Sequence, residues 1–437
     1  MTQFDQVIHD LAPQRFNIWG KLWTGLLIAV ILVGAYSYYQ QLKYGLIITD
    51  MRDYASWGVY ISNFVFFVAI SLVGSLITAI LRLSGVKWST PLTRISEIIA
   101  VAAIIMAGLT IIIDMGRPDR LFNLFFHGRL QSPIIWDVIV ITTYLVISVL
   151  LLYYPLLPDL AILKKYFAKN KWFTTWYTWL SINWTGSPIQ KRLSRRSIRA
   201  LSVMIIPVAF SIHTVTAWLF ATTYRPGWDS TNFGPYFIAG AFVAGAGAVV
   251  AVMYVFRKAY HLENYITDYH FDNMGKLLVL LCLVYLYFNV NEYLVPAYKV
   301  TEGESAHLNS LFFGEYAAMF WLVIVGGLVV PVIALIFPQG RKPLPLFIIA
   351  LIVVLGAWWK RYIIVTPTLL HPFLPIQGVP ESWHEYFPTW REWSITLATL
   401  ASSLLIITGL IRVLPVVPIQ ETLEERGIEE PIIEELK

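Results

Sequence analysis

The sequence predicts an all-α integral membrane protein with about ten transmembrane helices. Of its 437 residues, 57% are hydrophobic and 14% are charged, whereas soluble domains carry about 25% charged residues. Apolar runs near the length that crosses about 30 Å of hydrocarbon, roughly 20 residues, recur along the chain. The predicted spans are Lys21–Tyr39, Trp57–Leu83, Ile95–Met115, Ile134–Leu156, Ile198–Thr222, Pro235–Val255, Met274–Val290, Glu315–Phe337, Leu344–Thr366 and Trp393–Val413.

The first run is expected to stay in the membrane as a helix. A signal peptide begins with a basic segment and ends at a small-residue cleavage site, whereas this chain begins with Asp5 and Asp10 and has no such site after the run. With ten spans, both termini lie on one side. Lys and Arg concentrate in the loops of that side, and cytoplasmic loops retain positive charge. We therefore expect an N-in/C-in orientation.

Two charged segments, a basic loop and an acidic tail, are expected to be contact surfaces and do not indicate a reaction. The basic loop from Lys164 to Arg199 also carries four tryptophans; this composition is typical of a segment that lies against anionic membrane lipid, and we do not expect it to bind nucleic acid. The tail is acidic and is expected to be a solvated end or a partner contact. Its acids are Glu421, Glu424, Glu425, Glu429, Glu430, Glu434 and Glu435.

Cysteine and histidine usage argues against a cofactor of the chain's own. A single cysteine, Cys282, excludes a disulfide framework, a c-type haem attachment site and a cysteine-ligated iron–sulfur cluster. Of the eight histidines, only His213 lies within a predicted span. A bis-histidine haem b needs two ligands on facing helices. We therefore predict no metal site and no covalently bound cofactor, and we expect any redox metal to belong to another subunit.

The stretch from Asp114 to Asp137, DMGRPDRLFNLFFHGRLQSPIIWD, connects the third and fourth spans. Its two terminal aspartates sit where hydrocarbon should begin. A charge costs roughly 2.5 to 3.5 kcal/mol at the bilayer centre and less near its edge, so a plain connector would not need them. We predict that this hairpin forms the floor of a quinone pocket and a docking ledge for an electron-transfer partner.

Five polar residues within or beside the spans fall at one depth, the outer third of the membrane: Asn63, Asp114, Asp137, His213 and Arg361. Scattered core polar residues would not be expected to gather at one depth, so the pattern favours a shared site. Intramembrane ionisable residues commonly mark functional sites.

Quinol oxidation removes two protons and two electrons, and these residue types suit it. Asp137, Asp114 and His213 are the predicted catalytic proton acceptors, and Arg361 can hold a carboxylate charged or donate to a quinone carbonyl. Two alternatives stay open: His213 as a helix-packing residue, and Asp114 with Arg117 as a structural ion pair. The predicted quinone-binding residues are Asn63, Arg117, Arg361 and Trp136.

Several motifs together carry a resemblance to a known family. SWGVYISNFVF (Ser56 to Phe66), DMGRPDR, SPIIWD and SIHTVTAW with the loop RPGWDSTNFGPYFIAGA resemble the NrfD/polysulfide reductase membrane subunits. The likeness extends over helices 2 to 6, and is greatest to the ActC- and ActF-type subunits of alternative complex III. One position departs: Asp114 stands where we expect a histidine in the quinol-oxidising subunit, which leaves open whether this copy binds quinone or is the paralogue that does not.

The resemblance implies two four-helix bundles, helices 2–5 and 6–9, with helices 1 and 10 flanking them in a bacterial inner membrane. It implies a menaquinone site at the outer face, an iron–sulfur subunit docked there, and other membrane, c-type cytochrome or molybdopterin subunits that carry haem or molybdenum. The corresponding segments are 1–20 (cytoplasmic N-terminus), 21–55 (helix 1 and outer loop), 56–222 (first bundle), 223–366 (second bundle), 367–413 (outer loop and helix 10) and 414–437 (acidic cytoplasmic tail).

Proton movement has been proposed for complexes of this family, so a proton path is a further expectation. Its candidates are Glu97 and Tyr144 in the first bundle and Glu292 and Glu315 in the second. Two other classes fit parts of the pattern: a secondary transporter, which also has two similar bundles with intramembrane polar residues, and a purely structural anchor for redox subunits. Against a transporter, the polar cluster lies at one face instead of the midplane.

Overall fold

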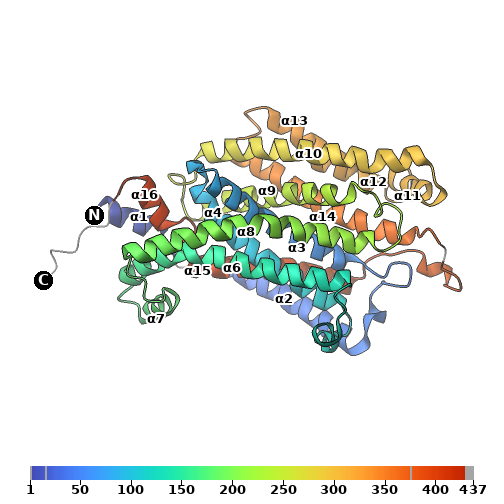
Figure 1. Cartoon of the computed structure of the whole chain (residues 1–437), viewed down its shortest axis with the longest axis horizontal. Helices are drawn as coiled ribbons and strands as arrows, with labels where there is room; N and C mark the ends of the chain where they lie inside the picture. The colour runs from blue at the N-terminus through green and yellow to red at the C-terminus, as the bar shows by residue number, and fades with distance from the viewer. Residues whose placement is uncertain (1, 15–16, 375, 429–437) are drawn as a thin grey trace.

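The structure is a computed structural model that describes residues 2–14, 17–374 and 376–428. Within these ranges all regular elements are helices, and the long ones run side by side along one axis (Figure 1). Ten are long and apolar enough to cross a membrane, which confirms the predicted all-α, ten-helix membrane fold. They are α2 (Ile18–Tyr44), α3 (Val59–Leu83), α4 (Thr90–Asp114), α6 (Pro133–Tyr166), α8 (Pro188–Ala221), α9 (Phe233–Ala259), α10 (Asp268–Lys299), α12–α13 (Ala317–Ile336), α14 (Pro343–Leu370) and α15 (Trp390–Val413).

Short helices mark the two ends of the molecule. The end with α1 (Gln3–Leu11), α7 (Lys171–Leu180) and α16 (Ile419–Glu425), at the left of Figure 1, is called the inner end here. The opposite, outer end carries α5 (Asn123–His127) and α11 (Glu302–Phe312). The last four acids predicted in the tail, Glu429, Glu430, Glu434 and Glu435, lie outside the described residues.

Three helices, α6, α8 and α10, extend well beyond their predicted spans. α10 contains 32 residues. Both α6 and α8 contain 34 residues, about 51 Å at 1.5 Å per residue, whereas the hydrocarbon is about 30 Å thick. The additional turns of α6 and α8 lie at the inner end. α7 connects these two extensions.

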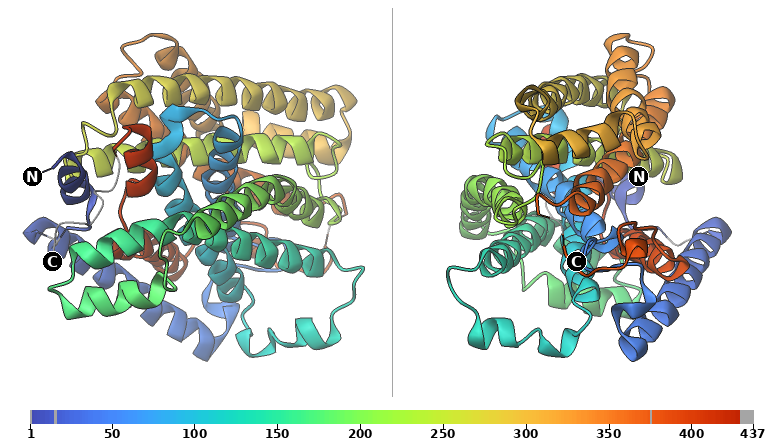
Figure 2. Two further views of the ribbon diagram at one scale, coloured as in Figure 1. Left: turned by 60° about the vertical axis from the view of Figure 1, so that its left-hand side comes forward. Right: turned by 90° about the vertical axis from the view of Figure 1, so that its right-hand side faces the viewer.

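Helix α3 is the centre of the packing. In its most apolar window 83% of the residues are buried, against 11% for α2. It contacts α4, α8, α9 and α14. Further contacts join α3, α4, α6 and α8 into one group and α9, α10, α12–α13 and α14 into another. Helices α2 and α15 pair along one edge, as the end-on view in Figure 2 shows.

The two groups meet where small residues let backbones approach. Gly245 of α9 packs directly on Val73 of α3, and a side chain at residue 245 would clash with it. Within the first group, Gly74 of α3 packs in the same way on the Ser96 backbone of α4. Small residues at such contacts let membrane helices gain dispersion energy that lipid cannot supply.

The eighth span is not a regular α-helix. Between α12 (Ala317–Trp321) and α13 (Val330–Ile336), residues Leu322–Val329 form a π-helix. Within it Gly327 lies against Gly356 of α14. π-Helical turns occur mostly at functional sites, and this one borders a small pocket whose lining includes Lys360.

Candidate functional site

Asp137 lies in the second turn of α6, near its outer end. The helix begins at Pro133, whose fixed φ suits the first helical position. The Asp137 side chain is 3% exposed, and its Oδ1 accepts a hydrogen bond of 2.7 Å from the Thr216 hydroxyl of α8. The bond joins α6 to α8 and leaves the second carboxylate oxygen available.

His213 precedes Thr216 by about one helical turn on α8. It is 1% exposed, and neither ring nitrogen meets the geometry of a hydrogen bond within the described part of the chain, although the Ala209 carbonyl one turn earlier lies close to the ring. Arg361 of α14 lies close enough for its charge to act on the ring. Buried polar atoms in proteins are ordinarily bonded, so an unbonded buried imidazole indicates a place for a ligand or water.

Arg361 is buried without a carboxylate partner. Its Nη2 donates to the Phe237 carbonyl at 3.3 Å, its guanidinium lies 4.5 Å from the centre of the Phe237 ring, and its Nη1 has no hydrogen-bond partner. None of the ion pairs among the described residues includes it. An uncompensated buried guanidinium is costly. Asp137 bonds to Thr216, about one turn after His213 on α8, and Arg361 lies near His213. These three residues, Asp137, His213 and Arg361, are hereafter called the α6–α8–α14 cluster.

Asn63 belongs to a separate, fully bonded contact. Its Oδ1 accepts from the Trp358 indole at 2.6 Å, and its Nδ2 donates to the Thr396 hydroxyl at 3.0 Å. The amide therefore joins α3, α14 and α15. The structure does not bring it into the α6–α8–α14 cluster.

Asp114 ends α4 and is half-buried, and its Oδ1 has no partner among the described residues. It lies within electrostatic reach of Glu392, whose carboxylate accepts bonds from the Tyr386 hydroxyl at 2.7 Å and the Asp50 amide at 3.0 Å. Those bonds connect the outer loops. Asp114 therefore lies beside another acid, on the α2–α15 side of the molecule.

Arg117 and Trp136 form hydrogen bonds within the outer hairpin. Arg117 is exposed and binds Asp119 in bidentate fashion at 3.0 and 2.9 Å, not Asp114. Gly116, with a φ of +66°, turns the chain at this point. The Trp136 indole donates to the Leu130 carbonyl at 2.5 Å and fixes the loop before α6.

The four residues of the predicted proton path lie at different depths. Glu97 is at the inner end in a buried ion-pair network with Arg82 (3.1 Å) and Arg94 (3.8 Å). Tyr144 is wholly buried, and its hydroxyl donates to the Ser71 carbonyl at 2.5 Å. Glu292 is buried near the outer end, whereas Glu315 is exposed there. No hydrogen bond between described residues joins any two of the four.

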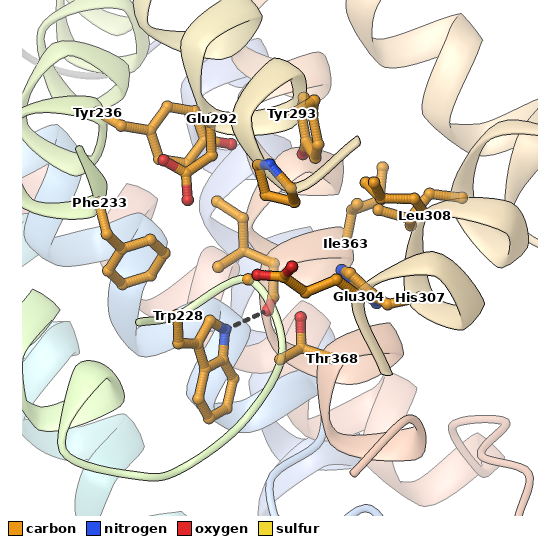
Figure 3. A pocket seen from close by; sticks show the side chains of 14 residues that line it. Trp228, Phe233, Tyr236, Glu292, Tyr293, Glu304, His307, Leu308, Ile363 and Thr368 are labelled. Carbon is orange, nitrogen blue, oxygen red and sulfur yellow. Dashed lines mark hydrogen bonds between the residues drawn. The ribbon is translucent and has the colours of Figure 1, made fainter. Parts of the chain in front are cut away.

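Glu292 lines a pocket at the outer end of the second helix group (Figure 3). Its carboxylate accepts bonds from the Ser230 hydroxyl (2.8 and 3.0 Å) and the Asn232 amide (2.9 Å). The pocket encloses about 430 Å³ of empty space when its open mouth is included. Its other polar lining residues include Tyr236, Tyr293, Glu304, His307 and Thr368.

Of the polar residues around this pocket only Glu292 was predicted, and the unpredicted ones include Lys360, Glu304 and His307. The Lys360 ammonium donates to the Tyr293 hydroxyl at 2.7 Å; its place beside Arg361 in an apolar run was an available signal. Glu304 and His307 lie on α11, outside the spans, where no sequence signal distinguished them. Burial, together with the neighbouring His371, lowers the pKa of His307 to about 3, so this imidazole is neutral at pH 7.

Tyr236 links the pocket to the α6–α8–α14 cluster. It lines the pocket, its ring stacks on Tyr285 at 5.5 Å, and both tyrosines lie close enough to Arg361 to interact with its charge. Within the described residues, no three His, Cys, Asp or Glu side chains converge in a way that could hold a metal ion.

Most of the chain matches one known protein family. The family model for polysulphide reductase, NrfD, matches residues 48–372, which include α3 to α14 and exclude α2 and α15. The chain therefore belongs to the NrfD family. The predicted resemblance to this family is confirmed.

Curated relatives of this NrfD-family chain match over nearly their whole length. It is 27% identical to a membrane subunit of a putative dimethyl sulfoxide reductase of Halobacterium salinarum (95% of this chain, 96% of the relative). It is 23% identical to a selenate reductase subunit of Mesobacillus selenatarsenatis (91% and 94%) and 21% identical to the integral membrane subunit of a menaquinone reductase of Nitratidesulfovibrio vulgaris (93% and 94%). These relatives are not named as alternative complex III subunits, so that finer resemblance stays a prediction.

Proposed function

We propose that this NrfD-family chain is the integral membrane subunit of a quinone-linked redox complex, and that a quinone head group binds at the α6–α8–α14 cluster. The observation that carries the proposal is the set of unpartnered buried atoms there: both ring nitrogens of His213 and Nη1 of Arg361. Relatives named as reductase subunits, one of them the integral membrane subunit of a menaquinone reductase, support the same class of complex.

The residue chemistry fits both directions of the reaction. Oxidation of a quinol to a quinone releases two protons and two electrons. The Asp137 carboxylate and a neutral His213 ring each accept one hydroxyl proton, and Arg361 donates to a quinone carbonyl. The electrons pass to an iron–sulfur partner subunit docked at the outer face, and on quinone reduction every step reverses.

The pocket around Glu292 fits a supporting role in proton transfer. Tyr236 lines this pocket and lies near Arg361, and the pocket is at the outer end of the molecule, beside α11. A proton that leaves the cluster on that side therefore has an acidic acceptor nearby. In this proposal the chain holds no redox cofactor, and haem or molybdenum belongs to other subunits of the complex.

The Asp137→Asn substitution tests the assignment. Because a positioned proton acceptor contributes about 10²- to 10⁴-fold, we expect quinone-linked turnover of the assembled complex to fall about 100-fold or more. Asp53→Asn, which changes an exposed acid at the same end, is the matched control and should leave turnover intact. Normal turnover in Asp137→Asn, with assembly verified, would contradict the site.

Binding of a quinone analogue separates the three classes of function. If the chain is a redox subunit, the complex purified with its partners should bind the analogue, and the bound analogue should shield the cluster. A transporter acts on its own substrate without partners, and a structural anchor binds neither.

A further inference from the structure

A hollow at the inner end is lined almost wholly by cations. It lies at the α7–α8 connection and the first turns of α8, and all five of its basic side chains are exposed. Arg195 forms a 3.4 Å ion pair with Glu424, and the other four form no ion pair with a described residue. The lining residues are Gly186, Pro188, Lys191, Arg192, Arg195, Arg196 and Arg199.

This hollow continues into a larger groove with an apolar wall. The two share Gly186, Lys191 and Arg195. The groove extends along α6 and α8, and part of its lining is apolar, from Pro155, Pro158, Ala161, Ile162 and Ile198, while Glu421 and Glu424 of α16 also line it. A cationic hollow outside the hydrocarbon matches a molecule with an anionic head.

The depth of the hollow corresponds to the lipid headgroups. Helix α8 ends outside at Ala221, so at 1.5 Å per residue Arg199 lies about 33 Å from that end and Arg192 about 44 Å. The hydrocarbon is about 30 Å thick, so with the outer end of α8 at its outer edge Arg199 lies about 3 Å beyond the inner edge and Arg192 about 14 Å beyond it. Beside them, α7 exposes Trp176 and Trp179, the latter by 82%, and exposed tryptophan is enriched at this level of a membrane.

We propose that the hollow, hereafter the α7–α8 hollow, is a binding site for an anionic phospholipid, with the headgroup phosphates on the arginines. Basic pockets between membrane helices bind such headgroups. The proposal is independent of the quinone site, which lies at the opposite end.

The chain's own acidic C-terminal segment is an anion that would compete with lipid for the hollow. Ile428 lines the groove, and the residues after it include four glutamates. An acidic segment could occupy a cationic hollow, so the test must distinguish lipid from this segment.

The experiment uses the full-length protein, delipidated in mild detergent and titrated with diphosphatidylglycerol, with bound lipid counted by native mass spectrometry. Near a membrane surface each cation contributes about 1 kcal/mol, roughly fivefold. The triple variant R192Q/R196Q/R199Q should therefore bind on the order of 100-fold more weakly. R192K/R196K/R199K, which keeps the charge, should bind nearly as the wild type does.

A matched control removes three exposed cations elsewhere at the inner end, K21Q/K258Q/K342Q, and should leave lipid binding unchanged. Equal binding by all variants, or equal loss in the control, would overturn the site. A truncation after Ile428 decides the competing case: if the wild type binds no lipid and the truncated chain does, the acidic segment occupies the hollow and the proposal fails. Unaltered binding after truncation supports it.

Discussion

At the scale of single residues, two kinds of buried charge distinguish the two ends of the molecule. At the outer end, Arg361 and His213 are buried, form no ion pair with a described residue, and have polar atoms without a hydrogen-bond partner among those residues. At the inner end, Arg94 binds Asp159 at 3.0 Å, and Arg82 binds both Glu97 and Glu421. The first arrangement suits a ligand. The second is an ion-pair network that holds α16 against α4 and α6, although Nε and Nη1 of Arg94 and Oε2 of Glu97 also have no hydrogen-bond partner among the described residues.

Glu97 tests how that inner network acts. Removing one partner of a buried ion pair costs about 3 to 5 kcal/mol because the other charge stays buried, so we expect Glu97→Gln to lower the thermal unfolding temperature clearly. Glu424→Gln, which breaks the exposed pair with Arg195, should change stability by at most about 1 kcal/mol. Thermal unfolding in detergent measures both.

The same variant addresses proton conduction. In a reconstituted complex that retains its fold, a role for Glu97 on an inner proton path predicts fewer protons moved per electron. Unchanged proton release per electron would assign Glu97 to the structural network alone and place any path elsewhere.

Sequence reasoning identified the cluster residues because each interrupts an apolar run. Placing Asp137, His213 or Arg361 in hydrocarbon costs free energy, and this cost can be recognised from the sequence alone. Which side chains pair with each other cannot be recognised in this way. The spacing of Asp114 and Arg117 suggested an ion pair, but the positive φ of Gly116 turns the backbone, and Arg117 binds Asp119 instead.

At the scale of helices, length and hydropathy determine the spans, but not their ends or their regularity. The apolar runs of α6 and α8 predicted the parts of these helices that cross the membrane. The polar turns beyond the runs are not hydrophobic, so hydropathy did not predict that the helices continue there. The π-helix Leu322–Val329 also has no sequence signature beyond its glycines. It lies where Gly327 packs closely on Gly356 of α14, a tertiary contact that a single apolar run cannot show.

The contact between α3 and α9 should depend on Gly245. A Cβ there meets Val73 of the central helix, so we expect Gly245→Ala to push the helices apart and to destabilise the protein by about 1 to 3 kcal/mol. Gly234→Ala, on the same helix with open space around it, should be neutral or slightly stabilising because alanine loses less backbone entropy. Equal unfolding temperatures for the two variants would contradict this packing.

At the scale of the whole molecule, the chain combines a helical body with surfaces that need partners. The family model includes α3 to α14, the two helix groups, while α2 and α15 form an edge pair. The outer hairpin exposes Phe122, Phe125, Phe126 and Leu130. Exposed apolar side chains on a polar hairpin outside the spans are suited to contact with another protein.

Isolation of the intact assembly is therefore the most informative test at this scale. In the proposed function, electrons that leave a quinol here pass to acceptors on other subunits. Gentle detergent extraction should co-purify an iron–sulfur subunit with haem or molybdenum subunits, identified by mass spectrometry, and the sample should give an iron–sulfur signal in low-temperature EPR. A chain that purifies alone without a paramagnetic signal would contradict the redox proposal and favour a transporter, for which substrate uptake into liposomes is the direct assay.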